Sequence, residues 1–187
     1  MSITGDDLPV QVTHIPGITR VKYTNSINQD VRLVTAGEDH LVRLLPSEPT
    51  ATDVIPLVLE DATQKISWIE ANSKYLVTAS EDGAVRLYQH ALQSEDDPQK
   101  ATSCIRMVRR EVLPVRCVSL ERATESPRAA ICSDELIIRV ANVEDPRQIT
   151  LLTGHTRGVR AASWSPILPL LVSCGSDGDI RVWDMSS

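Results

Sequence analysis

The sequence predicts an all-β protein built from small antiparallel sheets. Its last segment contains three short strand-like runs, at residues 159–163, 170–174 and 180–183. Asp177 and Gly178 stand between the second run and the third. An Asp-Gly pair in this position is a strong hairpin signal, because a type I′ turn needs positive φ at both of its central residues. We therefore expect tightly connected strands here.

Earlier parts of the chain repeat this unit. An acidic residue recurs before each third run, and an arginine follows each acid four residues later. The acids are Asp39, Asp82, Glu135 and Asp177, and the arginines are Arg43, Arg86, Arg139 and Arg181. Successive acids lie 43, 53 and 42 residues apart. This spacing indicates four divergent copies of one unit, in which the arginines belong to the framework and lie beside the turn acid.

The repeats divide the 187 residues without leaving room for a second domain. The units cover approximately residues 9–47, 54–90, 104–142 and 149–187 of a single domain. The polar, acidic stretch 91–103 accounts for the longest spacing and is interpreted as a solvated loop between the second and third units. A second polar break, residues 121–129, lies inside the third unit.

The last unit resembles a WD40 β-propeller blade. It opens on Gly154-His155 and closes on Trp183-Asp184, and a Gly-His to Trp-Asp unit of roughly 40–45 residues is the signature of that family. Closed propellers have about four to eight blades. The resemblance implies part of a larger propeller, most often seven-bladed, with about four blades present and the remaining blades missing from this chain. It also implies a fourth blade without its outer strand, and a self-paired dimer of half-propellers is the alternative.

Four residues of this unit have two interpretations. In WD40 blades, side chains at the positions of His155, Ser173, Asp177 and Trp183 form a buried hydrogen-bond chain. A serine, a histidine and an aspartate could instead form a hydrolase triad. The blade spacing explains all three, and no GxSxG motif is present. We therefore interpret the set as structural and expect no catalytic residue.

Composition narrows the function classes. A net charge of −6 and a pI near 5.2 argue against a nucleic-acid clamp driven by bulk charge. The chain lacks an apolar run of about 18 residues and a secretory leader, so we expect neither a membrane span nor secretion. The histidines have no metal-ligand spacing, and we expect no metal and no cofactor. His14 occupies the place of His155 in the first unit, His40 follows Asp39 in a tight turn that favours left-handed geometry, and His90 ends a strand.

The cysteines show no CxxC pattern and are interpreted as reduced structural thiols of a cytosolic or nuclear protein. They are Cys104, Cys117, Cys132 and Cys174, of which the last three lie in strand-like runs where thiols are commonly buried.

Arginines crowd the start of the third unit. Arg106, Arg109, Arg110 and Arg116 are the candidates for a nucleic-acid or partner-binding edge. The favoured interpretation is a solvated outer strand whose charges discourage edge pairing. A patch that contacts DNA phosphates is the alternative. It is disfavoured because no aromatic residues alternate with the arginines for base stacking.

The chain also resembles a more specific group. The runs HIPGITRVKYTNSINQDVRLVTAGEDHLVRLL, KISWIEANSKYLVTASEDGAVRLY, LPVRCVSL and AAICSDELIIRVANVED are similar, in this order, to the N-terminal propeller of a replisome adaptor family. That family includes acidic nucleoplasmic DNA-binding protein (And-1) and the fungal chromosome-transmission-fidelity and minichromosome-loss proteins. SDELIIRV is the most telling run, because generic WD40 units have Asp-Gly there.

This second resemblance implies a non-enzymatic adaptor in the nucleus. Such proteins act at replication forks, in sister-chromatid cohesion and in DNA repair, through protein partners among replisome or chromatin components. The family's second propeller and C-terminal helical region are not in these 187 residues. The alternative is a WD40 docking platform in RNA processing or in substrate recognition by a ubiquitin ligase. Neither interpretation predicts a small-molecule substrate.

Overall fold

The computed structural model describes residues 13, 15–24, 32–46, 57–72, 74–89, 106–121, 127–145 and 147–186. Side chains of residues 24, 32, 46, 89 and 106–110 are outside this description. Every regular element in the described ranges is a β-strand, so the expected all-β fold is confirmed. No helix long and apolar enough to cross a membrane occurs there. The stretch 91–103, residues 122–126 of the second polar break, and also His14, His90 and Cys104 lie outside the described residues.

The strands form four antiparallel sheets in chain order. The first contains β1 (Ile18–Thr24), β2 (Arg32–Gly37), β3 (Val42–Pro46) and β4 (Leu57–Leu59). The second contains β5 (Ile66–Ala71), β6 (Tyr75–Ser80), β7 (Ala84–Gln89) and β8 (Arg106–Arg110). The third contains β9 (Val115–Leu120), β10 (Arg128–Ser133), β11 (Ile137–Asn142) and β12 (Ile149–Thr153). The fourth contains β13 (Val159–Trp164), β14 (Leu170–Gly175) and β15 (Ile180–Asp184).

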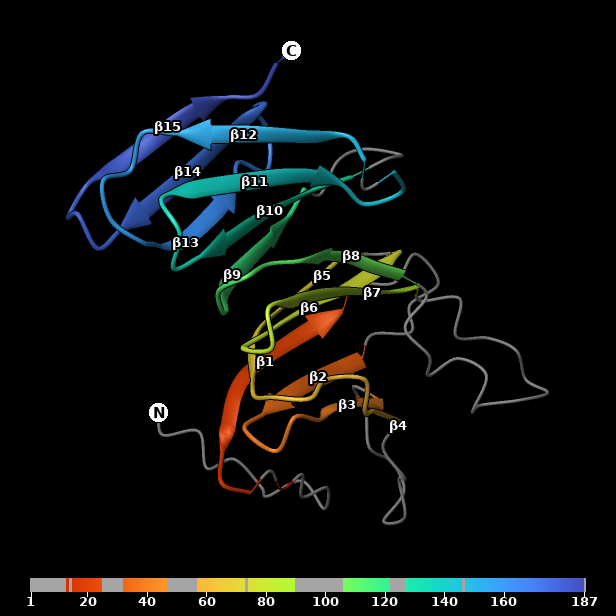
Figure 1. Cartoon of the computed structure of the whole chain (residues 1–187). Helices are drawn as coiled ribbons and strands as arrows, with labels where there is room; N and C mark the ends of the chain where they lie inside the picture. The colour runs from red at the N-terminus through yellow and green to blue at the C-terminus, as the bar shows by residue number, and fades with distance from the viewer. Residues whose placement is uncertain are drawn as a thin grey trace, which may run out of the picture.

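The four sheets follow one another in a row, as Figure 1 shows from the first sheet at the bottom to the fourth at the top. Their first strands, β1, β5, β9 and β13, are neighbours in that order. The core consists of three apolar layers between successive sheets. Ile69 and Leu76 belong to the first layer, Val118 and Ile131 to the second, and Ile138 and Leu171 to the third. Strand β6 is buried along its whole length because it lies in a sheet that is covered on both faces.

The outer strand of each complete sheet comes from the start of the next sequence unit. β4, β8 and β12 pair with β3, β7 and β11, respectively. The fourth sheet has three strands in the described part of the chain, in the order β13-β14-β15. The three strands of the fourth sheet agree with the blade without an outer strand that the WD40 resemblance implies.

The turns between the second and third strands differ from the expected type I′. The turns of the first, second and fourth sheets each contain a single residue with positive φ, namely His40 (68°), Gly83 (83°) and Gly178 (83°), and the turn of the third sheet contains none. A type I′ turn would need two. The loop between β6 and β7 has three residues, and the amide of Gly83 donates to the carbonyl of Ser80 at 3.1 Å. This is the three-residue hairpin loop with a left-handed final residue.

In the turns of the first, second and fourth sheets the acid has a negative φ and its carboxylate caps the turn from within. The amide of Ala84 donates to Oδ1 of Asp82 at 2.9 Å, and the amide of Asp179 donates to Oδ1 of Asp177 at 3.2 Å. Asp and Asn commonly stabilise turns through such a bond to the backbone two residues ahead.

One expectation about the cysteines is wrong. Cys117 and Cys132 are fully buried, but Cys174 is exposed. Val172 and Cys174 alternate with the buried Leu171 and Ser173 along β14. They therefore point to the face of the fourth sheet that no other described sheet covers.

Candidate functional site

The hydrogen-bond set of the last unit surrounds the ring of His155, which is buried just before β13. Its Nδ1 lies 2.8 Å from Oδ2 of Asp177, in the β14–β15 turn, and its Nε2 lies 2.8 Å from Oγ of Ser173, on β14. Trp183, on β15, donates its indole N–H to the same Ser173 oxygen at 2.9 Å. Four residues from two strands and two loops therefore form one continuous network.

One proton assignment satisfies every member of this network. The Ser173 hydroxyl accepts from Trp183 and donates to Nε2 of His155, so the ring proton is on Nδ1 and is donated to Asp177. This assignment follows from the partners, since hydrogen positions are inferred from the hydrogen-bond network. Burial opposes ionisation of Asp177, but the Thr156 amide and the His155 ring outweigh it and lower the pKa of Asp177 to about 2. Asp177 is therefore ionised at neutral pH.

The order Ser173–His155–Asp177 is also that of a hydrolytic triad. Ser173, however, is only 2% exposed, and its oxygen already accepts from Trp183. A nucleophilic serine must reach its substrate. In this geometry the hydroxyl links β14 to β15 instead.

Gly154, next to His155, packs closely against Arg181 and Trp183. A Cβ at this position would lie 2.8 Å from Nη1 of Arg181 and 3.3 Å from the ring of Trp183. The Gly-His pair and the Trp-Asp pair, which are distant in sequence, therefore meet at one packing contact.

The repeated arginines pair with the turn acids in three of the four units. Arg43 binds Asp39 at 2.7 Å, Arg86 binds Asp82 at 2.7 Å and Arg139 binds Glu135 at 2.6 Å. Arg181 departs from the expectation, since it binds Asp179 at 3.0 Å. The reason is that His155 occupies Oδ2 of Asp177.

The second unit shows how an arginine replaces the histidine. The amide of Thr63 donates to Asp82 at 3.1 Å, just as the amide of Thr156 donates to Asp177 at 2.9 Å. This equivalence puts Ala62 in the place of His155, and Arg86 supplies the missing donors. Burial opposes ionisation of Asp82, but the hydrogen bonds from Arg86 and from the Ala84 and Thr63 amides lower its pKa well below the usual range.

A second series of ion pairs, which the sequence analysis missed, joins one sheet to the next. Lys65 binds Glu38 at 2.9 Å, Arg116 binds Glu81 at 3.2 Å and Asp134 at 2.6 Å, and Arg160 binds Asp134 at 3.3 Å. We call this series the ion-pair ladder. Each acid directly precedes a turn acid, and each cation lies at the start of a first strand. The sequence signal that could have predicted this series is the pair of consecutive acids in three units, Glu38-Asp39, Glu81-Asp82 and Asp134-Glu135.

The position of Arg116 in the ion-pair ladder shows that it does not share an edge with the other three arginines proposed from the sequence. Arg116 lies on β9, the first strand of the third sheet, and is paired with two carboxylates. Arg106, Arg109 and Arg110 lie on β8, which is the outermost strand of the second sheet. The fold therefore separates Arg116 from the other three, whose side chains are outside the described part.

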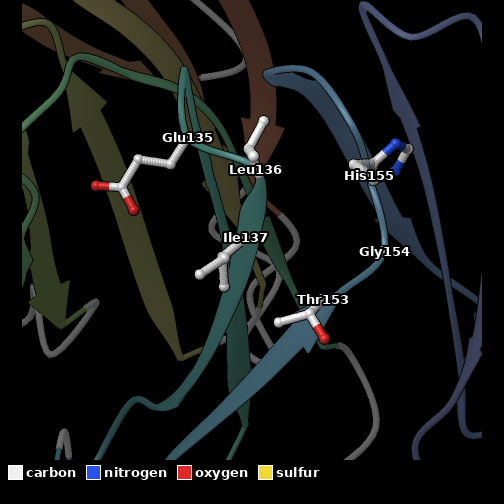
Figure 2. A pocket seen from close by; sticks show the side chains of 6 residues that line it. All are labelled: Glu135, Leu136, Ile137, Thr153, Gly154 and His155. Atoms are coloured by element: carbon white, nitrogen blue, oxygen red, sulfur yellow. The ribbon is translucent and has the colours of Figure 1, made fainter.

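A cavity of about 480 Å³ opens between the start of β11 and the segment that leads into β13. Its lining residues are Glu135, Leu136, Ile137, Thr153, Gly154 and His155. In Figure 2 the Glu135 side chain points away from the segment 153–155. Leu136, at the position where the turns of the second and fourth units have glycine, is 49% exposed. Among the residues that the structure describes, no three His, Cys, Asp or Glu side chains are grouped to hold a metal ion.

Comparison with known proteins places this geometry in context. The family model of the WD domain, G-beta repeat, matches residues 59–89 and 146–184. The chain is 28% identical over 173 residues to WD repeat and HMG-box DNA-binding protein 1 of Xenopus laevis, an alignment that covers 92% of this chain and 14% of that protein. It is 31% identical over 123 residues to human Striatin-4, covering 60% of this chain and 16% of that protein. It is 51% identical over 37 residues to coatomer subunit alpha of Saccharomyces cerevisiae, covering 20% of this chain and 3% of that protein.

These matches and the four antiparallel sheets agree. The chain carries WD40 repeats and has the all-β fold of a partial WD40 propeller, and its WD-repeat relatives support a scaffold or adaptor. The chain spans at most about one-sixth of the length of these three relatives.

Proposed function

We propose that this chain is a non-enzymatic WD40 scaffold that acts in the nucleus, on chromatin or at the replication fork, in DNA replication, sister-chromatid cohesion and repair. The observation that carries the proposal is the extent of one alignment. The similarity to the frog WD repeat and HMG-box DNA-binding protein covers 92% of the chain, whereas the coatomer similarity covers 20%. A relative named for DNA binding is thus matched across all four sheets.

The polar residues of the blades support a scaffold rather than an enzyme. Trp183 donates a hydrogen bond to Ser173 of the Ser173–His155–Asp177 set. The other turn acids are bound by arginines of their own units, and they are Asp39, Asp82 and Glu135. These groups hold strands together. In such a fold the loops are free to vary and to bind protein partners.

The proposal is tested by the position of the protein relative to newly made DNA. In cells that express the tagged protein from its own locus, nascent DNA is labelled briefly, captured and probed. We expect the protein in the nucleus, enriched on nascent DNA and depleted after a chase with unlabelled nucleoside. A cytoplasmic protein, or enrichment that does not change during the chase, would overturn the replication role. Such a result would favour docking in another pathway, such as RNA processing or ubiquitin-ligase substrate recognition.

Direct contact with DNA is a separate part of the proposal and rests on the arginines of β8. The exposed edge of a sheet can present basic side chains to phosphates, which contribute affinity and salt dependence but no sequence preference. The double variant Arg109→Glu/Arg110→Glu is compared with Arg147→Glu, whose side chain is 90% exposed at a different loop. We expect only the double variant to bind a fluorescent duplex more weakly and with a smaller salt slope. An unchanged slope excludes this contact without affecting the adaptor role.

A further inference from the structure

Two buried thiols face each other across the first two strands of the third sheet. Cys117 on β9 is directly opposite Cys132 on β10 in the strand register. Both residues are 0% exposed, and both thiols are free. Directly opposite Cβ atoms in an antiparallel pair are about 4.5–5.5 Å apart, whereas a disulfide needs about 3.5–4.5 Å. A small local adjustment would therefore bring the two sulfurs into bonding distance.

The thiol pair also lies at the boundary with the fourth sheet. Cys117 and Cys132 belong to the apolar layer that contains Val159, Ala162 and Leu171. The Cys117 thiol donates to the carbonyl oxygen of Ala162, on β13, at 3.7 Å. A thiol is a weak donor, but here its proton links the third sheet to the fourth.

The two thiols are chemically unequal. Hydrogen bonding between them lowers the pKa of Cys117, whereas the same interaction together with burial raises the pKa of Cys132. Cys117 is therefore the first of the pair to form the thiolate, which is the nucleophilic form of cysteine. Cys132 stays protonated and is placed to resolve an oxidised Cys117.

We propose that Cys117 and Cys132 form an oxidation site, at which a peroxide converts the pair into an intramolecular disulfide. The Cys117 thiolate attacks one peroxide oxygen, so that an S–O bond forms, the O–O bond breaks and a sulfenic acid results. The Cys132 sulfur then attacks the Cys117 sulfur, an S–S bond forms, and the S–O bond breaks. Both thiol protons leave in water. In total, two thiols are oxidised and one hydrogen peroxide is reduced to two waters.

Oxidation has a structural consequence at the sheet boundary. A disulfide sulfur carries no proton, so the Ala162 carbonyl loses the donor that Cys117 supplies. The bond fixes β9 to β10 while it removes one link to β13. The oxidised protein should accordingly open more readily between the third and fourth sheets.

The test uses the full chain with the other two cysteines replaced, Cys104→Ser/Cys174→Ser, so that only the proposed pair remains. The folded protein is treated with hydrogen peroxide, alkylated after unfolding and examined by mass spectrometry. We expect complete loss of alkylation at both sites, a mass lower by two hydrogens, and one peptide pair joined through Cys117 and Cys132. Because Cys117 and Cys132 are buried, their oxidation by peroxide in the folded protein should be slower than alkylation of the exposed Cys174 in the unsubstituted chain.

Two further variants in the same background identify the roles. With Cys132→Ala, oxidation should stop at the sulfenic acid of Cys117, which dimedone traps as one adduct. With Cys117→Ala, both the disulfide and the adduct should be lost. Circular dichroism checks that each variant is folded. If one variant does not fold, the other alone is sufficient to test the role of Cys117. Two alkylated thiols after peroxide treatment, or a disulfide between two molecules, would overturn the proposal.

Hydrogen exchange measures the consequence for the fold. Amides of β13 should exchange severalfold faster in the disulfide form than in the reduced form, while those of β6 should not change. Equal exchange at β13 in both forms would overturn the proposed link between oxidation and the sheet boundary.

Discussion

Oδ2 of Asp177 lies 2.8 Å from Nδ1 of His155, and this contact determines which acid Arg181 binds in the same unit. Arg181, four residues further on, is left to bind Asp179. In the second unit, where Ala62 takes the place of the histidine, Asp82 is bound by Arg86. A histidine from the entering loop and an arginine from the third strand are therefore alternative partners for one acid.

Replacing His155 should destabilise the fourth sheet. His155→Ala leaves Asp177 and Ser173 without their ring partner in a buried place, and we expect a loss of about 3 kcal/mol in the free energy of unfolding. Urea unfolding followed by circular dichroism measures it. The matched control is Arg157→Ala, two residues away and exposed, which should have little effect. Equal unfolding midpoints for the two variants would contradict the structural role of the network.

The two kinds of arginine pair should differ in strength. The Arg86 and Asp82 side chains are 7% and 3% exposed, so Arg86→Ala leaves a buried carboxylate unpaired and should cost about 3 kcal/mol. The Arg181 and Asp179 side chains are 34% and 54% exposed, and that solvated pair should contribute less than about 1 kcal/mol. Thermal or urea unfolding of both variants compares them. A larger loss for Arg181→Ala would show that burial does not govern these pairs.

Two turn glycines with the same backbone conformation provide an internal comparison. Gly83 and Gly178 both have φ of 83°, where a side chain costs roughly 1–2 kcal/mol. A Cβ at Gly178 would meet nothing within 4 Å, whereas a Cβ at Gly83 would collide with the carbonyl oxygen of Glu111. We expect Gly178→Ala to lower the unfolding free energy by about 1 kcal/mol and Gly83→Ala to lower it by more. If the two losses in unfolding free energy are the same, the contact between Gly83 and the β8–β9 loop does not limit the space for a side chain at residue 83.

Asp177 makes stability depend on acidic pH. Its pKa is about 2 in the folded chain, against about 3.9 for an unperturbed aspartate. The unfolded chain therefore takes up a proton first, and the contribution of Asp177, complete above about pH 4, is lost as the pH falls to about 2. Carboxyl NMR titration of the folded protein gives the pKa directly. A midpoint near 3.9, or unfolding free energies that vary equally with pH in wild type and Asp177→Asn, would contradict this.

Local pattern was sufficient to predict the fold class, whereas the residues of the blade network were implied by the resemblance to WD40 blades. The turn acids recur at fixed distances from strand-like runs, and strand periodicity is a local property. The prediction of a type I′ turn was wrong because an Asp-Gly pair is compatible with two kinds of hairpin loop. The choice between them depends on whether the acid caps the turn, as Asp82 does through the Ala84 amide.

What the tertiary structure decided is which groups meet between sheets. The sequence determined that acids and arginines recur in register, but not that Arg181 would bind Asp179 and not Asp177. Nor did it determine that Arg116 would bridge Glu81 and Asp134, or that Cys174 would be exposed while Cys117 faces Cys132. The two Arg116 contacts join residues 35 and 18 positions apart, and the exposure of Cys174 depends on which sheet face is covered. Packing between neighbouring sheets sets both, and no single strand encodes them.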